Sequence, residues 1–121
     1  MSKKIAYLGL GTMGRAMTRN LVEAGYTVRG YDPDPIAREN AKSFGVEVFL
    51  SAGEAAANVD VICSSVPRTE HVEETYLSDD GALSTASRGT VCFDFSTISP
   101  EGSCKVAEEA KKNGVIFLDT P

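Results

Sequence analysis

Residues 4–14 read KIAYLGLGTMG, an apolar stretch that runs directly into a glycine-rich turn. Residues 4–8 have the composition of a buried strand. Residues 13–24 have the spacing of a helix, with Met13, Met17 and Leu21 on one apolar face. The turn between them fits the pattern G-x-G-x-x-G. A strand, this turn and a helix in that order are typical of a βαβ unit that binds a dinucleotide.

Each glycine of this turn has a physical role. Gly9 permits the tight turn, Gly11 leaves room for a pyrophosphate to approach the backbone, and Gly14 lets the helix pack close to the strand. The unpaired amides near Thr12 and Met13 would face the phosphates at the positive end of the helix. The alternative is a tight strand-to-helix turn that binds nothing.

Asp32 ends the second predicted strand, about 20 residues after the glycine turn, where a dinucleotide fold needs an acceptor for the adenosine ribose. A carboxylate there also repels a 2′-phosphate, which predicts a preference for NAD over NADP. Arg29 and Arg38 would weaken this preference if their side chains faced the phosphate. The alternative role for Asp32 is to cap the turn at Asp34-Pro35.

Strands and helices alternate along the rest of the chain. Further strands are predicted at residues 27–31, 46–49, 59–66, 91–95 and 115–118. Further helices are predicted at residues 35–44, after Ser51, at 69–77 and at 100–112. The run 59–66 is the best candidate for a central strand. The alternation predicts one Rossmann-type α/β domain over residues 1–121, a doubly wound parallel sheet with strand order 3-2-1-4-5-6.

Composition narrows the class of protein. The 121 residues include 12 Lys and Arg against 17 Asp and Glu, a formal net charge of −5, and 42% are hydrophobic. This is the balance of a globular domain with one core. No apolar run is long enough for a membrane span, and the lack of a basic stripe argues against nucleic acid. We expect a cytoplasmic domain with neither membrane nor nucleic acid as partner.

Three cysteines form no pattern that would hold zinc or a disulfide framework. Cys63 and Cys92 lie in apolar runs and are expected to be buried free thiols, as in a reducing compartment, and Cys104 remains unpaired. No metal site is expected.

Three segments resemble one enzyme family. Residues 9–17, GLGTMGRAM, are similar to the G-L-G-x-M-G-x-x-M signature of the β-hydroxyacid dehydrogenases. That family includes 3-hydroxyisobutyrate dehydrogenase and 2-hydroxy-3-oxopropionate reductase. Residues 94–100, DFSTISP, resemble its D-x-S-T-x-x-P segment, and residues 117–121, FLDTP, its F-L-D-A-P. The resemblance implies the N-terminal NAD-binding domain of such an enzyme, of the kind also found in 6-phosphogluconate dehydrogenase.

The resemblance also implies where the cofactor lies. The Val66-Pro67 loop would lie against its nicotinamide half, and His71 and Thr97 match positions that contact it. Ser96 would lie beside the substrate. Together with the glycine turn, the cofactor-binding residues are Gly9, Leu10, Gly11, Thr12, Met13, Gly14, Tyr31, Asp32, Val66, Pro67, His71 and Thr97.

Some of these residues have simpler alternatives. His71 could be a solvated surface residue, and the segment Ser96-Thr97 could be a loop that caps the helix at Pro100. The neighbouring polar residues are expected to lie on a solvated helix face or to pack at a strand end. They are Glu70, Glu73 and Glu74 for the helix face, and Ser64 and Ser65 for the strand end.

Family members continue past the third segment into an all-α domain that carries the catalytic lysine and most of the dimer interface. We expect residues 1–121 to bind NAD, to contain no catalytic residue, and to be inactive alone. In a longer, homo-oligomeric dehydrogenase they would serve hydride transfer between nicotinamide and a small β-hydroxyacid. The alternatives are a stand-alone NAD-responsive module and the cofactor domain of an imine reductase.

Overall fold

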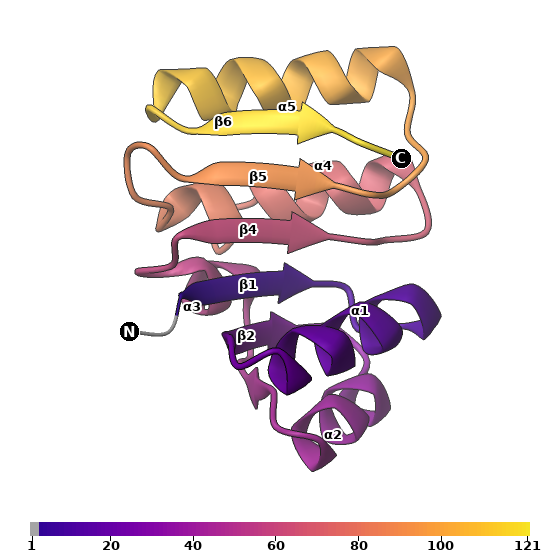
Figure 1. Ribbon diagram of the computed structural model, residues 1–121. Coiled ribbons are helices and arrows are strands. Elements are labelled where there is room, and N and C mark those ends of the chain that lie inside the picture. Colours follow the sequence, from indigo (N-terminus) through magenta and orange to yellow (C-terminus); the bar gives the residue numbers. More distant parts are fainter. Residues whose placement is uncertain (1–2) are drawn as a thin grey trace.

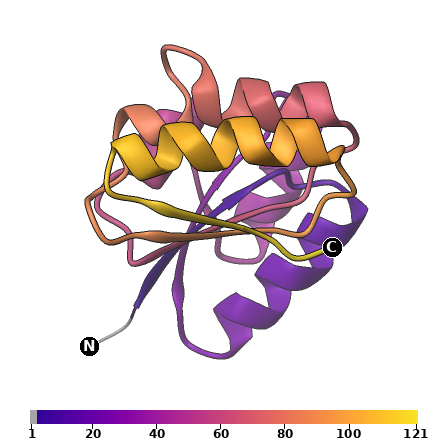
Figure 2. The same cartoon turned by 90° about the horizontal axis from the view of Figure 1, so that it is seen from above.

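Six parallel strands form one sheet, with helices on both of its faces (Figures 1 and 2). The computed structural model describes residues 3–121, so residues 1–2 of the predicted domain lie outside it. The strands lie in the order β3-β2-β1-β4-β5-β6, and every neighbouring pair is parallel. The predicted doubly wound fold and its strand order are confirmed.

Each helix and strand lies close to its predicted position. The strands are β1 (Lys4–Leu8), β2 (Thr27–Tyr31), β3 (Glu47–Val48), β4 (Val61–Ser64), β5 (Val91–Asp94) and β6 (Ile116–Asp119). The helices are α1 (Thr12–Glu23), α2 (Pro35–Ser43), α3 (Ala52–Ala56), α4 (Thr69–Leu77) and α5 (Pro100–Lys112). A short 3-10 helix, Ala82–Ser84, follows α4, and the sequence pattern gives no signal for it. The run 59–66 is central as predicted, but only residues 61–64 are strand.

The two faces of the sheet carry separate apolar cores. Tyr7 and Val28 lie in the core under α1 and α2, whereas Leu8, Ile62 and Tyr76 lie in the core under α3, α4 and α5. Figure 2 shows α4 and α5 on the opposite side of the sheet from α1. None of the helices in residues 3–121 has the length and apolar content that crossing a membrane would require.

Side-chain caps begin three of the helices. Asp34 Oδ1 accepts a hydrogen bond from the Ile36 amide at 2.9 Å, and Ser99 Oγ accepts one from the Gly102 amide at 3.1 Å. Ser51 Oγ likewise accepts one from the Glu54 amide at 3.1 Å. Proline follows Asp34 and Ser99, where its fixed φ suits the first helical position. These predicted helix starts are confirmed.

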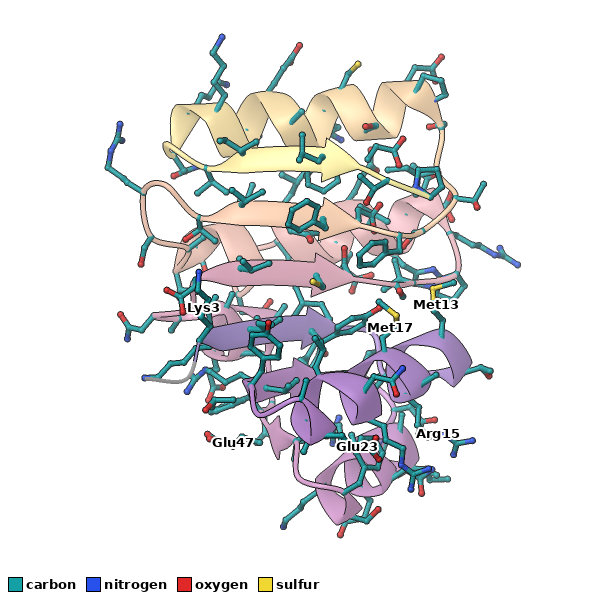
Figure 3. The ribbon with its side chains drawn as sticks, viewed as in Figure 1. Lys3, Met13, Arg15, Met17, Glu23 and Glu47 are labelled. Carbon is teal, nitrogen blue, oxygen red and sulfur yellow. The ribbon has the colours of Figure 1, made fainter. Side chains whose placement is uncertain are left out.

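The glycine turn brings α1 so close to β1 that it decides which face of α1 is buried. A Cβ on Gly14 would overlap the Gly9 carbonyl, and the buried residues of α1 are Gly14 and Thr18. The predicted apolar face is therefore wrong at its first position. Met13 is 54% exposed (Figure 3), because the close packing at Gly14 rotates it away from the core.

Replacing Gly14 with Ala is expected to lower the free energy of unfolding by about 3 kcal/mol. That is the upper end of the range for inserting a methyl group into a packed interior. The upper end applies because the methyl group would meet the backbone carbonyl of Gly9 rather than a flexible side chain. Urea unfolding followed by circular dichroism measures the change. Gly11→Ala is the matched control, because its Cβ would meet no protein atom within 4 Å. It should change stability by less than about 1 kcal/mol. Equal losses in the two variants would contradict this account.

Candidate functional site

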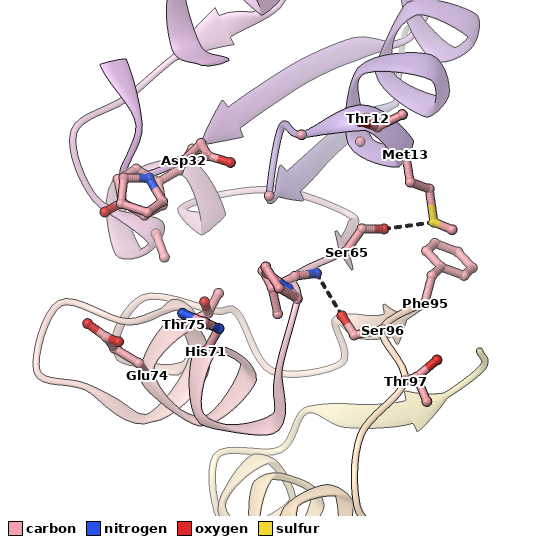
Figure 4. Close-up of a pocket in the computed structure, with 18 of the residues that line it drawn as sticks. Thr12, Met13, Asp32, Ser65, His71, Glu74, Thr75, Phe95, Ser96 and Thr97 are labelled. Carbon is pink, nitrogen blue, oxygen red and sulfur yellow. Dashed lines mark hydrogen bonds between the residues drawn. The ribbon is translucent and has the colours of Figure 1, made fainter. Parts of the chain in front are cut away.

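A cavity of about 610 Å³ opens at the carboxyl edge of the sheet, beside the β1–β4 junction. This is the switch point of the strand order, where open α/β sheets bind their ligands. Every predicted site residue except Leu10 lines it. Figure 4 shows Asp32 at one end, and Phe95, Ser96 and Thr97 at the other. We call these the Asp32 end and the Ser96 end. The Ser96 end also includes Val66 and Pro67.

The glycine turn forms one wall of the cavity. Gly9 has a φ of +100°, and a Cβ there would overlap the Ser65 carbonyl. The first hydrogen bond of α1 runs from the Arg15 amide to the Gly11 carbonyl at 2.7 Å. The amides of residues 12–14 therefore have no partner within the helix. They lie at the positive end of the helix dipole, which favours an anion.

Asp32 supports the turn and also lines the cavity. Its Oδ2 accepts a hydrogen bond from the Leu10 amide at 2.7 Å, and its Oδ1 accepts one from the Asp34 amide at 2.8 Å. Asp32 therefore also stabilises the turn at Asp34, which was its alternative role. The cap of α2 is Asp34 itself. Each carboxylate oxygen keeps acceptor capacity for a ligand. Leu10 contributes its amide to this contact, and its side chain is buried in the core rather than in the cavity.

Both arginines near Asp32 in the sequence are held by backbone carbonyls. Arg38 Nη1 donates to the Asp32 carbonyl at 2.8 Å, and Arg29 donates to the Ala55 and Glu54 carbonyls at the end of α3. Neither lines the cavity. Within residues 3–121, no lysine or arginine lines it, and its carboxylates are Asp32, Glu74 and Asp80. Its charged lining is therefore mostly acidic.

One face of α4 forms the wall opposite the glycine turn. The residues of this wall follow the spacing i, i+3, i+4, i+7: His71, Glu74 and Thr75 in α4, and Ser78 directly after it. His71 is exposed and faces the cavity, so its two predicted descriptions both apply. Glu74 is exposed, as expected of a solvated helix face, and it also lines the cavity, which the site prediction missed. The helical spacing from His71 was the signal that could have indicated it.

The strand-end serines have different surroundings. Ser65 lines the cavity, where its hydroxyl lies 2.8 Å from Tyr7 Oη and 3.3 Å from Met13 Sδ. Ser64 is fully buried, as expected for packing at the strand end. Its hydroxyl lies 2.8 Å from Tyr76 Oη and donates to Asp94 Oδ1 at 2.8 Å.

Asp94, at the end of β5, is a further carboxylate that the site prediction missed, besides Glu74 and Asp80 in the cavity lining. Its side chain is fully buried, and Ser96 donates to the same Oδ1 through its hydroxyl at 2.8 Å. Asp94 Oδ2 has no hydrogen-bond partner within the described part of the chain. Burial raises the pKa of the Asp94 carboxyl, the hydrogen bonds from Ser96 and Ser64 offset part of the rise, and the Asp119 carboxylate adds to it.

Neither buried thiol is activated, and the part of the chain that the structure describes holds no metal cluster. Cys63 and Cys92 are buried, as predicted, and burial raises the pKa of Cys63 to about 11 and that of Cys92 to about 12. Both thiols therefore stay protonated at neutral pH. No group of three potential metal ligands occurs among residues 3–121.

The family that this chain matches agrees with the fold and the cavity described above. Residues 4–121 match the family of the NAD binding domain of 6-phosphogluconate dehydrogenase. The chain belongs to this family. It is an NAD(P)-binding domain of the β-hydroxyacid dehydrogenase type, as the sequence resemblance implied.

Individual relatives agree with the family. An NAD-dependent L-serine dehydrogenase from Pseudomonas aeruginosa is 38% identical over 98% of this chain and 40% of its own length. A probable 3-hydroxyisobutyrate dehydrogenase from Mycobacterium bovis is 44% identical over 97% of this chain and 39% of its own. A solved structure of 3-hydroxyisobutyrate dehydrogenase from Mycobacterium tuberculosis with L-serine has a TM-score of 0.92 and 44% identity. The match covers 100% of this chain and 40% of that one. The chain thus spans about 40% of the length of these relatives.

Replacing Asp94 with Asn removes a buried charge and keeps the Oδ1 acceptor. The pKa of Asp94 is higher in the folded chain than in the unfolded chain, where it is about 3.9. Ionisation therefore lowers folding stability as pH rises through this interval. The free energy of unfolding of Asp94→Asn minus that of the unaltered chain should increase as pH rises from about 4 to 7. Urea unfolding at several pH values measures it.

Asp79→Asn, in the exposed turn after α4, is the control for a change in net charge. A difference for Asp94→Asn that stays constant or falls with rising pH would contradict the expected ionisation.

Proposed function

We propose that residues 1–121 form the cofactor domain of a longer NAD-dependent dehydrogenase that acts on a small β-hydroxyacid. NAD would occupy the cavity, with adenosine at the Asp32 end and nicotinamide at the Ser96 end. A bound nicotinamide supplies hydride transfer, and the chain's own residues hold and orient it.

The space in front of Gly11 carries this proposal. A Cβ on Gly9 or Gly14 would overlap protein atoms, whereas a Cβ on Gly11 would meet nothing within 4 Å. Packing within the protein therefore gives no reason for glycine at position 11. A ligand that approaches the backbone there does give one, and the unpaired amides of residues 12–14 suit a pyrophosphate.

The Asp32 end favours NAD over NADP. Ribose hydroxyls can donate to the Asp32 carboxylate, which would repel a 2′-phosphate. Recognition of that phosphate is usually by arginine or lysine, and neither lines the cavity within residues 3–121. Arg29 and Arg38 are engaged with backbone carbonyls instead.

The substrate class follows from the relatives. They bear the names of 3-hydroxyisobutyrate and L-serine dehydrogenases, and both substrates are small acids with a β-hydroxyl group. We infer 3-hydroxyisobutyrate or 2-hydroxy-3-oxopropionate as the substrate type, with L-serine as a second candidate. Ser96 would lie on the substrate side, and the catalytic base would come from outside residues 1–121.

Gly11→Ala tests cofactor binding without disturbing the fold. The added methyl group would occupy the space proposed for the pyrophosphate, so the affinity for NADH should fall at least about tenfold. Calorimetric titration of the unaltered chain and the variant measures it, with the unfolding experiment above as the check on stability. Unchanged NADH affinity in Gly11→Ala, or no binding by the unaltered chain, would refute the proposal.

Asp32→Ala tests the preference between the two cofactors. Removing the carboxylate should narrow the ratio of NAD to NADP affinity on the order of tenfold, because the repulsion of the 2′-phosphate is lost. Asp32→Asn is the closest variant in size, since it removes the charge and keeps an oxygen for the Leu10 amide, although the Asp34 amide then loses its acceptor. It should narrow the ratio similarly. A ratio that neither variant changes in calorimetric titrations would show that the charge plays no part.

A further inference from the structure

We propose that Asp94 is a positioning residue for the Ser96 end of the cavity. One buried carboxylate oxygen joins the segments after β4 and β5 to α4, and so fixes the walls between which nicotinamide would lie. The inference rests on the proposed function, because it assigns a task to one end of that cavity.

The first connection runs from Asp94 to the backbone after β4. Asp94 Oδ1 accepts hydrogen bonds from the Ser96 hydroxyl at 2.8 Å and from the Ser96 amide at 3.3 Å. Ser96 Oγ in turn accepts one from the Val66 amide at 2.8 Å, the dashed line at Ser96 in Figure 4. Both segments line the cavity, so the Asp94 carboxylate sets the separation between two of its walls.

The second connection runs from Asp94 to α4. Ser64 donates to Asp94 Oδ1 at 2.8 Å, and its oxygen lies 2.8 Å from Tyr76 Oη. Because the Ser64 proton goes to Asp94, the Tyr76 hydroxyl donates to Ser64. Tyr76 belongs to the helix that presents His71, Glu74 and Thr75 to the cavity. The same oxygen therefore ties a third wall to the other two.

This arrangement is costly for a purely structural feature. Ser64, Tyr76 and Asp94 are fully buried, and Asp94 Oδ2 lacks a partner among the described residues. A buried, unpaired polar oxygen destabilises a fold, and apolar groups of the same shape would pack there at lower cost. The network does, however, hold three walls of the cavity in a single arrangement.

The network also fixes what Ser96 offers to a ligand. Its proton is donated to Asp94, and one lone pair accepts from the Val66 amide. Toward the cavity it therefore presents only an acceptor, which suits the amino group of a nicotinamide carboxamide or the hydroxyl of a substrate. A ligand carboxylate would gain no hydrogen bond from Ser96 unless Ser96 left Asp94.

Two ligands, NADH and ADP, test the two ends of the cavity separately. NADH would reach both ends, whereas ADP would occupy only the glycine turn and the Asp32 end. Asp94→Ala and Ser96→Ala should each weaken NADH binding on the order of tenfold and leave the ADP affinity within about twofold. Asp94→Asn, which keeps an oxygen at Oδ1, should hold the NADH affinity within about threefold. Calorimetric titration of the full chain with each ligand measures the ratio of the NADH affinity to the ADP affinity.

Thr90→Ala is the matched control for the loss of a buried polar side chain. Thr90 is buried beside the opposite end of β5, away from the cavity, so its replacement should leave the NADH-to-ADP ratio unchanged. Equal weakening of NADH and ADP by Asp94→Ala, or no weakening of NADH, would overturn the inference alone. Failure of the unaltered chain to bind either ligand would instead refute the proposed function, and the inference with it.

Hydrogen exchange at the Val66 amide tests the same network without any ligand. Exchange should accelerate about tenfold in Asp94→Ala and Ser96→Ala, where the support of that amide is lost, and stay within about twofold in Asp94→Asn and Thr90→Ala. This measurement applies even to a variant too unstable for titration, since exchange at Val66 can be compared with that of the amides of β4, which ends at Ser64. Equal acceleration throughout β4 would contradict a local role.

Discussion

The Gly9 carbonyl occupies the space where a side chain on Gly14 would begin, and the rest of the site depends on this contact. It holds the first turn of α1 against the end of β1, which leaves three helix amides facing the cavity. It also directs Gly14 and Thr18 toward the sheet, so that Met13 projects beside the cavity. The switch point between β1 and β4 supplies the opening in front of these amides.

The two ends of the cavity are built by different means. At the glycine turn and Asp32, backbone amides and one carboxylate provide the polar groups, and this carboxylate joins the turn after β1 to the turn after β2. At the Ser96 end, side-chain hydroxyls converge on a single buried carboxylate, and the contacts join residues about 30 positions apart. The first end is thus set within one βαβ unit, whereas the second is set only when β4, β5 and α4 have assembled.

That difference explains how far the sequence could predict the molecule. The bounds of β1, β2 and α4, the caps at Asp34 and Ser99, and the glycine turn depend on neighbouring residues, and the sequence pattern predicted them. The rotation of α1, the turning of Glu74 toward the cavity and the sharing of Asp94 Oδ1 depend on packing between distant segments. The spacing of residue types along the sequence does not indicate that packing. The family resemblance gave roles to Ser96 and Thr97 but none to Asp94, whose carboxylate holds Ser96.

The acidic lining has a consequence for how an anion would be received. The cavity carries three carboxylates and no lysine or arginine within residues 3–121, on a chain of net charge −5. Under the proposed function, phosphate groups would be accepted by peptide dipoles and not by oppositely charged side chains. Dissolved salt would then screen the repulsion between the phosphates and the cavity carboxylates more than the attraction to the peptide dipoles. Binding of the anion would therefore not weaken with ionic strength as it does at a basic surface. Under that function, recognition would depend on the path of the main chain, and a single added carbon atom would weaken it.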